Sequence, residues 1–361
     1  MFKTLMGCKD GGMGSVAVRA GLAVLVLVAA SCARESVPGT EEARSTVSFT
    51  IGEAAGTRAS VTPYENVVSS LDVLCFRSGD GLYGNSNRVV ASGGETLSGI
   101  STELMDGVSY DWYVIANAPA GSLGYTSKAA FLAGLTDLMD GTARSLVMMG
   151  SGTVLASEGG APVPVALDRY ACKVTVREVC VEWPDAFASY ASVSLGRIAL
   201  VNVVGTTPWS GVAEAGELWY NRMGIDYSAP EYVRDLTVRQ YGTALAEGVP
   251  ADVESPLYCM PNPVVSNKNS KNAPEWSPRS TRVAVEILLD GFPNWYPVDL
   301  PAMACNTHYV INRLTVKGPG SQGPDWPVER DDIQFTVSVE PWVDGDVVPV
   351  FQEPFPVPAS G

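Results

Sequence analysis

The sequence is poor in charge and has almost no histidine. Charged residues make up 17% of the 361 residues, and His308 is the only histidine. A catalytic triad would have to use His308, which lies in the strand-like sequence Asn-Thr-His-Tyr and has no nucleophile motif to serve. The glycine pairs lack the Lys-Ser/Thr that completes a phosphate-binding loop. The sequence therefore predicts no enzyme, no metal site and no cofactor.

The balance of charge excludes a further class of partner. The formal net charge is −15, which opposes binding to nucleic acid and attraction to an anionic membrane surface. Hydrophobic residues make up 46% of the chain, which is ample for large cores. We therefore expect a folded protein that contacts a membrane only through a covalent lipid.

Beyond residue 32 the sequence has few cysteines, and their number is odd. The five are Cys75, Cys172, Cys180, Cys259 and Cys305, so at most two disulfides can form. Cys172 and Cys180 fall on one predicted strand, about 26 Å apart, and cannot pair there. We expect most of these cysteines to act as small buried residues.

The longest apolar run ends in small residues and a cysteine. Residues 21–32 read Gly-Leu-Ala-Val-Leu-Val-Leu-Val-Ala-Ala-Ser-Cys, after a segment that carries lysine and arginine. The run is too short to cross a bilayer of about 30 Å, so it is typical of a cleaved signal. Its ending predicts a lipoprotein signal peptide over residues 1–31 and a lipid on Cys32. An ordinary secretory signal with a coincidental cysteine is the alternative.

Alternating apolar residues predict strands along most of the remaining chain. In Ser45–Ile51 the side chains of Val47, Phe49 and Ile51 share one face. Similar runs are Leu71–Cys75, Tyr110–Ala116, Ala171–Val181, Val193–Val204, Arg282–Leu289, Tyr309–Val316 and Ile333–Val339. Helical spacing over Thr126–Met139, with Ser127 as N-cap, predicts the one substantial helix. The expected fold is all-β, with two antiparallel β-sandwich domains and one short helix in the first.

Prolines after a glycine pair mark the boundary between the two predicted domains. Pro162 and Pro164 follow Gly159-Gly160. We therefore expect an N-terminal domain over residues 45–165 and a C-terminal domain over 166–345. A leader covers 32–44, a proline-rich tail covers 346–361, and Ala213–Asn272 is predicted to form large loops.

The C-terminal quarter of the chain contains Asn306-Thr-His-Tyr-Val-Ile-Asn-Arg-Leu-Thr-Val-Lys-Gly-Pro-Gly320, followed by Phe335-Thr-Val-Ser-Val-Glu-Pro-Trp342. This stretch resembles the end of the Bacteroidales fimbrillins, the major fimbrial subunits, and it is the most specific part of the similarity. Upstream, Leu71–Phe76, Tyr113–Pro119 and Arg169–Glu178 are similar to core strands of that family. The resemblance covers most of residues 45–345 and is weak in the loops.

This resemblance implies transthyretin-like sandwiches and a structural role in a surface fimbria that supports adhesion. Family members are exported as lipoproteins, carry a palmitate-type anchor to the outer membrane, and are cut by an arginine-specific protease after the first strand. The matching position is Arg58, in Gly56-Thr-Arg-Ala-Ser60. Arg34 and Arg44 are alternatives, and an arginine in such a turn is often only a solvated loop residue. The implied partners are other subunits, the protease and the outer membrane.

Polymerisation by strand exchange requires a donor segment, expected at the C-terminus. The candidate residues are Val347, Val348, Val350 and Phe351. Prolines at 349, 354, 356 and 358 lack the amide donor that a central strand uses. The alternatives are therefore a disordered or polyproline tail and a tip or anchor subunit.

A second class of function is a lipid-anchored module that binds a host protein or a glycan. Aromatic residues on sandwich loops commonly serve such binding, although they also pack in cores. The candidates are Trp209, Trp219, Tyr220, Tyr227, Tyr232, Trp276, Trp295 and Tyr296.

Overall fold

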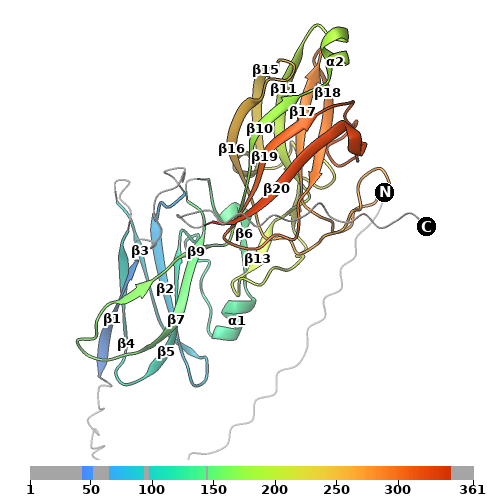
Figure 1. Ribbon diagram of the computed structural model, residues 1–361. Coiled ribbons are helices and arrows are strands. Elements are labelled where there is room, and N and C mark those ends of the chain that lie inside the picture. The colour runs from blue at the N-terminus through green and yellow to red at the C-terminus, as the bar shows by residue number, and fades with distance from the viewer. Residues whose placement is uncertain (1–42, 52–64, 93–96, 144, 343–361) are drawn as a thin grey trace, which may run out of the picture. The chain divides into compact units, whose positions relative to one another are not determined.

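The computed structural model describes residues 43–51, 65–92, 97–143 and 145–342 (Figure 1). Within these residues strands dominate and the helices are short. The prediction of a mainly β fold with two sandwiches is confirmed.

Two sheets built from residues 44–169 enclose the first core. One sheet has the strand order β3-β2-β5-β7-β9, and the other has the order β4-β1-β8. The bounds are β1 (Arg44–Ile51), β2 (Ser70–Arg77), β3 (Tyr83–Val90), β4 (Gly99–Met105), β5 (Ser109–Ala116), β7 (Met148–Leu155), β8 (Val163–Val165) and β9 (Asp168–Arg169). Alternate residues of β2 face this core. Leu74 and Phe76, on the other face of β2, belong to the hydrophobic cluster that includes the second core, described next. β2 is therefore buried on both faces.

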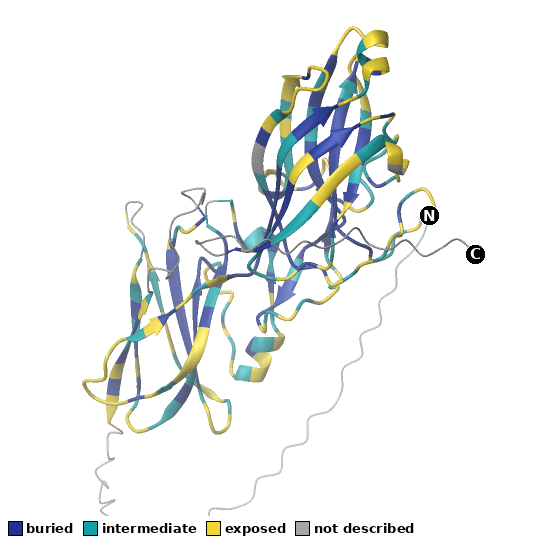
Figure 2. Cartoon of the chain, viewed as in Figure 1, coloured by how far each residue is buried: buried dark blue, intermediate teal, exposed yellow. Residues whose placement is uncertain are grey.

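The second core lies between two four-stranded sheets. Their strand orders are β16-β10-β19-β20 and β15-β11-β17-β18. The bounds are β10 (Cys172–Val181), β11 (Val193–Val201), β15 (Val238–Ala244), β16 (Ala251–Cys259), β17 (Arg282–Leu289), β18 (Phe292–Asp299), β19 (Thr307–Val316) and β20 (Ile333–Pro341). The pair β10 and β19 is parallel, and the other neighbours in these two sheets are antiparallel. Buried residues concentrate in these strands, while α2 (Pro184–Ser189) is mostly exposed (Figure 2).

The helix predicted over Thr126–Met139 is wrong in length. α1 covers only Lys128–Ala133, with the Ser127 hydroxyl accepting the Ala130 amide at 3.2 Å as expected for its N-cap. The chain then forms β6 (Leu135–Asp137), which pairs with β13 (Thr206–Pro208), and the 3-10 turn η1 (Leu138–Asp140). A Cβ atom at Gly134 would lie 2.1 Å from the Tyr125 hydroxyl, so glycine permits this close approach. Pairing with a distant strand has overridden the helical spacing.

The large loops predicted over Ala213–Asn272 contain regular elements. Besides β15 and β16, this region forms β14 (Trp219–Tyr220), paired with β12 (Val203–Val204), and α3 (Glu231–Thr237). Gly242 within β15 and Pro256 within β16 interrupt the strand pattern that the sequence offers. The remaining 3-10 turn, η2 (Arg330–Asp332), precedes β20.

The division between the predicted domains stays a prediction. β8 ends at Val165, β9 still pairs with β7, and β10 begins at Cys172. Contacts also join the two sets of sheets, since the Tyr170 hydroxyl donates to the Trp209 carbonyl at 2.7 Å.

His308 on β19 is a largely buried imidazole without a catalytic setting. Its Nε2 lies 2.9 Å from the Thr175 hydroxyl, and its Nδ1 lies 3.9 Å from Glu340. Burial, reinforced by the charges of Lys173 and Arg177, lowers its pKa from 6.5 to about 3. The folded protein therefore keeps His308 neutral, and stability is lost as the pH falls from 6.5 towards 3.

Replacement of His308 by glutamine should flatten this acid loss. Between pH 6 and pH 4 we expect the wild type to lose about 2 kcal/mol more unfolding free energy than His308→Gln, because only the unfolded wild type takes up that proton. Urea unfolding at several pH values measures the difference. Parallel profiles would contradict the lowered pKa.

Candidate functional site

β1 is the central strand of the three-stranded sheet. Seven residue pairs join it antiparallel to β4, from Arg44 with Met105 to Thr50 with Gly99. On its other side, Phe49–Ile51 pairs parallel with β8. Within the described part of the chain, neither β4 nor β8 has another strand beside it in this sheet. Loss of β1 would therefore deprive both of their neighbour.

The inward side chains of β1 complete the first core. Val47 is 6% exposed and Phe49 is 1% exposed, and Ile51 packs at the margin of the same cluster. The ring of Phe49 lies 5.3 Å from that of Trp112 on β5. The predicted shared face of Val47, Phe49 and Ile51 is present, and its removal would expose an apolar floor.

The backbone of β1 divides its hydrogen bonds between the two neighbours. The Ile51 amide donates to the Ser98 carbonyl at 2.9 Å, and the Asp106 amide donates to the Ala43 carbonyl at 2.8 Å. Since bonded pairs alternate along an antiparallel ladder, the odd-numbered residues of β1 bond to β4 and the even-numbered ones point towards β8. The pairing with β8 begins only at Phe49, so Thr46 and Ser48 lie outside it.

The buried carboxylate of Glu65 joins this residue to Trp342, the last described residue of the chain. Glu65 is 0% exposed and pairs with Lys173 at 2.8 Å. The Tyr258 hydroxyl donates to it at 2.6 Å, and the Trp342 indole donates at 3.2 Å. Arg169 lies 4.6 Å above the Trp342 ring and donates to the Trp342 carbonyl at 3.3 Å. We call Glu65, Lys173, Tyr258, Trp342 and Arg169 the Glu65 cluster.

Sequence reasoning missed this cluster because its members are far apart in the chain. Glu65 reads as a loop residue, and nothing local marks it as buried. The one local signal is Lys173, a charged residue between the apolar residues Cys172 and Val174 at the start of β10, because a buried lysine requires a partner.

Several predicted site residues fall outside the described part of the chain. These are Cys32, Arg58, Val347, Val348, Val350 and Phe351. Lipidation, processing and donation of a strand therefore stay predictions.

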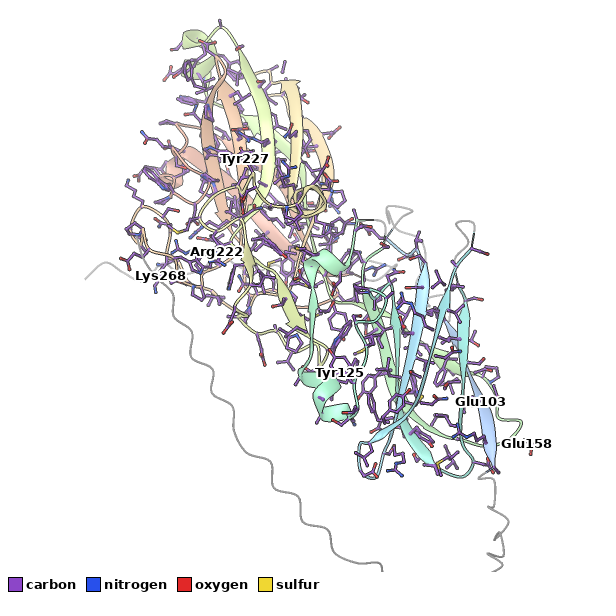
Figure 3. The ribbon with its side chains drawn as sticks, turned by 180° about the vertical axis from the view of Figure 1, so that it is seen from behind. Glu103, Tyr125, Glu158, Arg222, Tyr227 and Lys268 are labelled. Carbon is purple, nitrogen blue, oxygen red and sulfur yellow. The ribbon has the colours of Figure 1, made fainter. Side chains whose placement is uncertain are left out.

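The aromatic residues proposed for a binding module are mostly part of the core. The buried ones are Trp209, Trp219, Tyr220, Trp295 and Tyr296. Trp276 is half-buried against Trp219. Tyr227 is 59% exposed, with the Arg197 guanidinium 5.5 Å from its ring. Tyr227, Arg222 and Lys268 project from the loops of the second sandwich (Figure 3), but no row of exposed rings accompanies them among the described residues.

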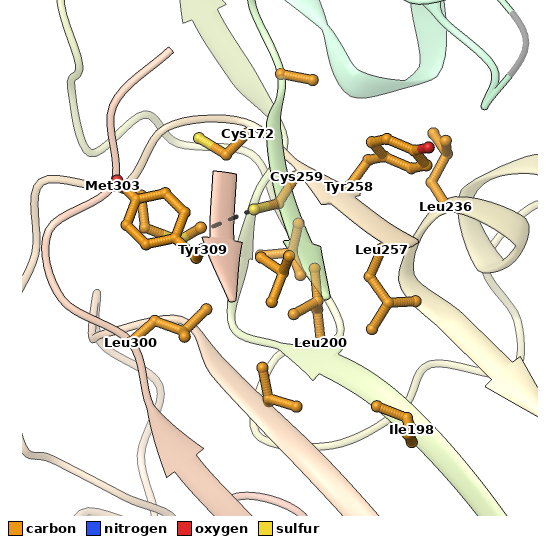
Figure 4. Packing of buried hydrophobic residues seen from close by; sticks show 14 of the residues in the cluster. Cys172, Ile198, Leu200, Leu236, Leu257, Tyr258, Cys259, Leu300, Met303 and Tyr309 are labelled. Atoms are coloured by element: carbon orange, nitrogen blue, oxygen red, sulfur yellow. Dashed lines mark hydrogen bonds between the residues drawn. The ribbon is translucent and has the colours of Figure 1, made fainter. Parts of the chain in front are cut away.

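The described cysteines are all free. Cys75, Cys172, Cys180 and Cys259 are buried, as expected for small core residues. Cys172 and Cys259 lie opposite each other on β10 and β16, and the Cys259 sulfur is 3.9 Å from that of Met303 (Figure 4). Burial raises the pKa of the Cys75 thiol to about 12, so this thiol is unreactive.

The described residues contain neither a metal-binding group nor a membrane-spanning helix. No group of three or more His, Cys, Asp or Glu side chains is placed to hold a metal ion. Over the same residues, no helix has the length and apolar character needed to cross a membrane.

Comparison with known proteins supports the resemblance to fimbrillins. Residues 45–161 match the family model of the major fimbrial subunit protein (FimA). This match begins within β1 and ends just before β8. A structural subunit is the role that this family description names, which agrees with the expectation that the protein is not an enzyme.

Solved structures share the fold over most of the chain. A fimbrilin from Porphyromonas gingivalis has a TM-score of 0.57 and 18% identity, covering 84% of this chain and 98% of its own. A candidate cell adhesion protein from Bacteroides eggerthii has a TM-score of 0.60 and 17% identity, covering 83% of this chain and 96% of its own. One from Parabacteroides distasonis has a TM-score of 0.57 and 17% identity, covering 86% and 99%. A search of curated proteins found no match.

Truncation of Phe49 tests how far the first sandwich depends on β1. We expect Phe49→Ala to lower the unfolding free energy by about 3–5 kcal/mol, because it leaves a cavity against Trp112. Thr50→Ala, at an exposed position of the same strand, should change it by less than about 0.5 kcal/mol. Equal effects in urea unfolding would contradict the assigned face.

Removal of the Glu65 carboxylate should also be costly. Glu65→Ala leaves Lys173 buried without its partner carboxylate, and we expect a loss of about 3–5 kcal/mol. The matched control is Glu178→Ala, which removes an exposed pair with Arg313 and should cost about 1 kcal/mol or less. Urea unfolding of both variants measures the difference, and a Glu65 effect no larger than the control would contradict a closed buried cluster.

Proposed function

We propose that this chain, whose residues 45–161 match the major fimbrial subunit family, is a structural subunit of a bacterial surface fimbria that polymerises by strand exchange. The observation that carries the proposal is the place of β1. One strand fills the space between β4 and β8 and supplies the inward side chains Val47 and Phe49. Its departure would leave a slot for a strand from another copy.

The lipid would deliver the subunit to the outer membrane. In this proposal Cys32 becomes the lipidated first residue after removal of the signal peptide. The leader at 32–44 then connects the lipid directly to β1, which begins at Arg44. A cut at any point after β1 would separate the lipid, the leader and β1, as one piece, from the rest of the subunit.

Arg58 is the proposed processing site because of its position. It lies in the segment between Ile51, the last residue of β1, and Glu65, the anchor of the Glu65 cluster. A cut there would free β1 with the lipid and leave Glu65 attached to the core. Arg34 and Arg44 precede β1 or begin it, so a cut at either would leave the strand in place.

The geometry of β1 limits how the donor segment can enter. Running in the direction of β1, a donor with Pro349 at the place of Ser48 would put Val348 at Val47 and Val350 at Phe49. Proline is tolerated at the place of Ser48 for two reasons. The amide at this even-numbered position does not point towards β4, and the position lies outside the pairing with β8. Burial of such side chains is worth roughly 25 cal/mol per Å² of apolar area, hence several kcal/mol for the segment.

A tip or anchor subunit is the second candidate. The observation that favours it is the series of prolines at 354, 356 and 358, which cannot supply a longer donor strand. A module that binds host protein or glycan is less favoured, because the aromatic residues proposed for it are mostly buried.

Substitution of Arg58 tests the proposal. We expect full-length protein treated with an arginine-specific protease to lose the segment that carries β1 and then form non-covalent, heat-labile multimers. Arg58→Ala should stay uncut between Ile51 and Glu65 and stay monomeric, while Arg44→Ala should behave as the wild type. Gel electrophoresis with and without heating, N-terminal sequencing and electron microscopy give the readouts.

The results separate the candidates. Fibres support the repeating subunit. Cut protein that stays monomeric but joins the end of fibres made by another subunit supports a tip or anchor role. Multimers whose N-terminus lies before Ser45 would overturn the proposed loss of β1.

A further inference from the structure

The outer edge of β4 is covered by side chains rather than by a strand. β4 is the edge strand of its sheet, with β1 on its inner side. Ile100 and Thr102 form hydrogen-bonded pairs with Phe49 and Val47 of β1. The residues that alternate with them along β4 therefore direct their carbonyl groups away from β1. The outward carbonyls are those of Ser101 and Glu103.

Two asparagines of β3 satisfy these outward carbonyls. The Asn87 side-chain amide donates to the Ser101 carbonyl at 2.7 Å, and the Asn85 amide donates to the Glu103 carbonyl at 2.8 Å. Asn85 and Asn87 are two residues apart on β3, and so are their acceptors on β4. Figure 3 marks Glu103 at this edge. The two sheets of the first sandwich are thus bridged along one side.

Other contacts that hold β4 are at its ends or in the core. Ile100 and Leu104 are buried in the first core. The Met105 amide donates to the Tyr110 hydroxyl at 3.3 Å, and the Leu97 amide, before the strand, donates to the Val68 carbonyl at 3.0 Å. Along the middle of β4, the backbone bonds to β1 and to the two asparagines.

We propose that Asn85 and Asn87 are positioning residues that hold β4 in register after β1 has left, and that they direct an incoming strand to the inner edge. This inference rests on the proposed exchange of β1 for a strand of another subunit. The outer carbonyls of β4 already have donors, whereas the inner ones lose theirs with β1. A strand from a second copy of this chain therefore finds open acceptors only inside the slot.

The test compares variants before and after removal of β1. The full chain is cut with an arginine-specific protease and mixed with a labelled synthetic peptide of residues 343–361. The test variant is Asn85→Ala with Asn87→Ala. The matched control is Asn294→Ala on β18, whose side-chain amide donates at 3.2 Å to the Phe292 carbonyl within the same strand.

In the cut protein we expect the double variant to bind the peptide about tenfold more weakly than the wild type and the control, because two hydrogen bonds that order the slot are lost. Hydrogen exchange of residues 99–105 should be faster by about the same factor. In the uncut protein β1 still pairs with β4, so exchange of the segment and the urea midpoint should change much less than in the cut protein.

The outcomes distinguish this inference from the proposed function. Cut wild type that binds no peptide counts against the donor segment, and the exchange comparison still decides the role of the asparagines. Equal exchange of residues 99–105 in cut wild type and cut double variant overturns the inference, even where the peptide binds. A double variant that speeds exchange of residues 99–105 as much before the cut as after it also overturns it, since the asparagines would then be general supports. Asn87→Ala alone, at the more exposed position, provides the same comparison if the double variant does not fold.

Discussion

The first sandwich depends on a constraint of sheet pairing, namely that β4 and β8 meet only through β1. One flank of β1 is antiparallel and the other is parallel, and the strand also supplies Phe49 to the core. A strand so placed cannot fray gradually, because its loss exposes two backbone edges and an apolar floor together. The same features that make β1 necessary for a stable monomer make the space it fills complementary to another strand of similar pattern.

The Glu65 cluster adds a second constraint. A buried carboxylate with a buried lysine contributes little net stability relative to apolar residues, but it is costly to disrupt once formed. Its partners come from β10, β16 and the residue after β20, so it fixes Glu65 and Trp342 at one place. In the proposed assembly the processed end and the donor tail would therefore leave the subunit from neighbouring, fixed points.

The sequence predicts β1 well and β3 and β7 poorly, for physical reasons. β1 has one polar and one apolar face, so its period of two is visible. β3 reads as a loop because Asn85 and Asn87 serve as hydrogen-bond donors at an edge, and β7 is obscured by Gly150 and Gly152. Those glycines are required by distant neighbours, since a Cβ at Gly150 would lie 2.3 Å from the Ala166 carbonyl oxygen. Glu65 carries no local signal at all. The helix over Thr126–Met139 failed for the same reason, because β13 captures Leu135–Asp137.

Proline in β8 shows how such a slot accommodates residues that sequence rules count against strands. Pro164 lies opposite Thr50, in the parallel pair with β1. The even-numbered residues of β1 point towards β8, so Thr50 bonds to the residues on either side of Pro164, and the missing amide of Pro164 faces away. The same rule applies to a donor strand, in which proline is excluded from the odd positions that bond to β4 and from the place of Thr50, but not from the place of Ser48. For Val348, Pro349 and Val350 this leaves one register. A shift by two places in one direction puts Pro349 opposite β8, and a shift by two in the other puts the polar Gln352 into the space of Phe49.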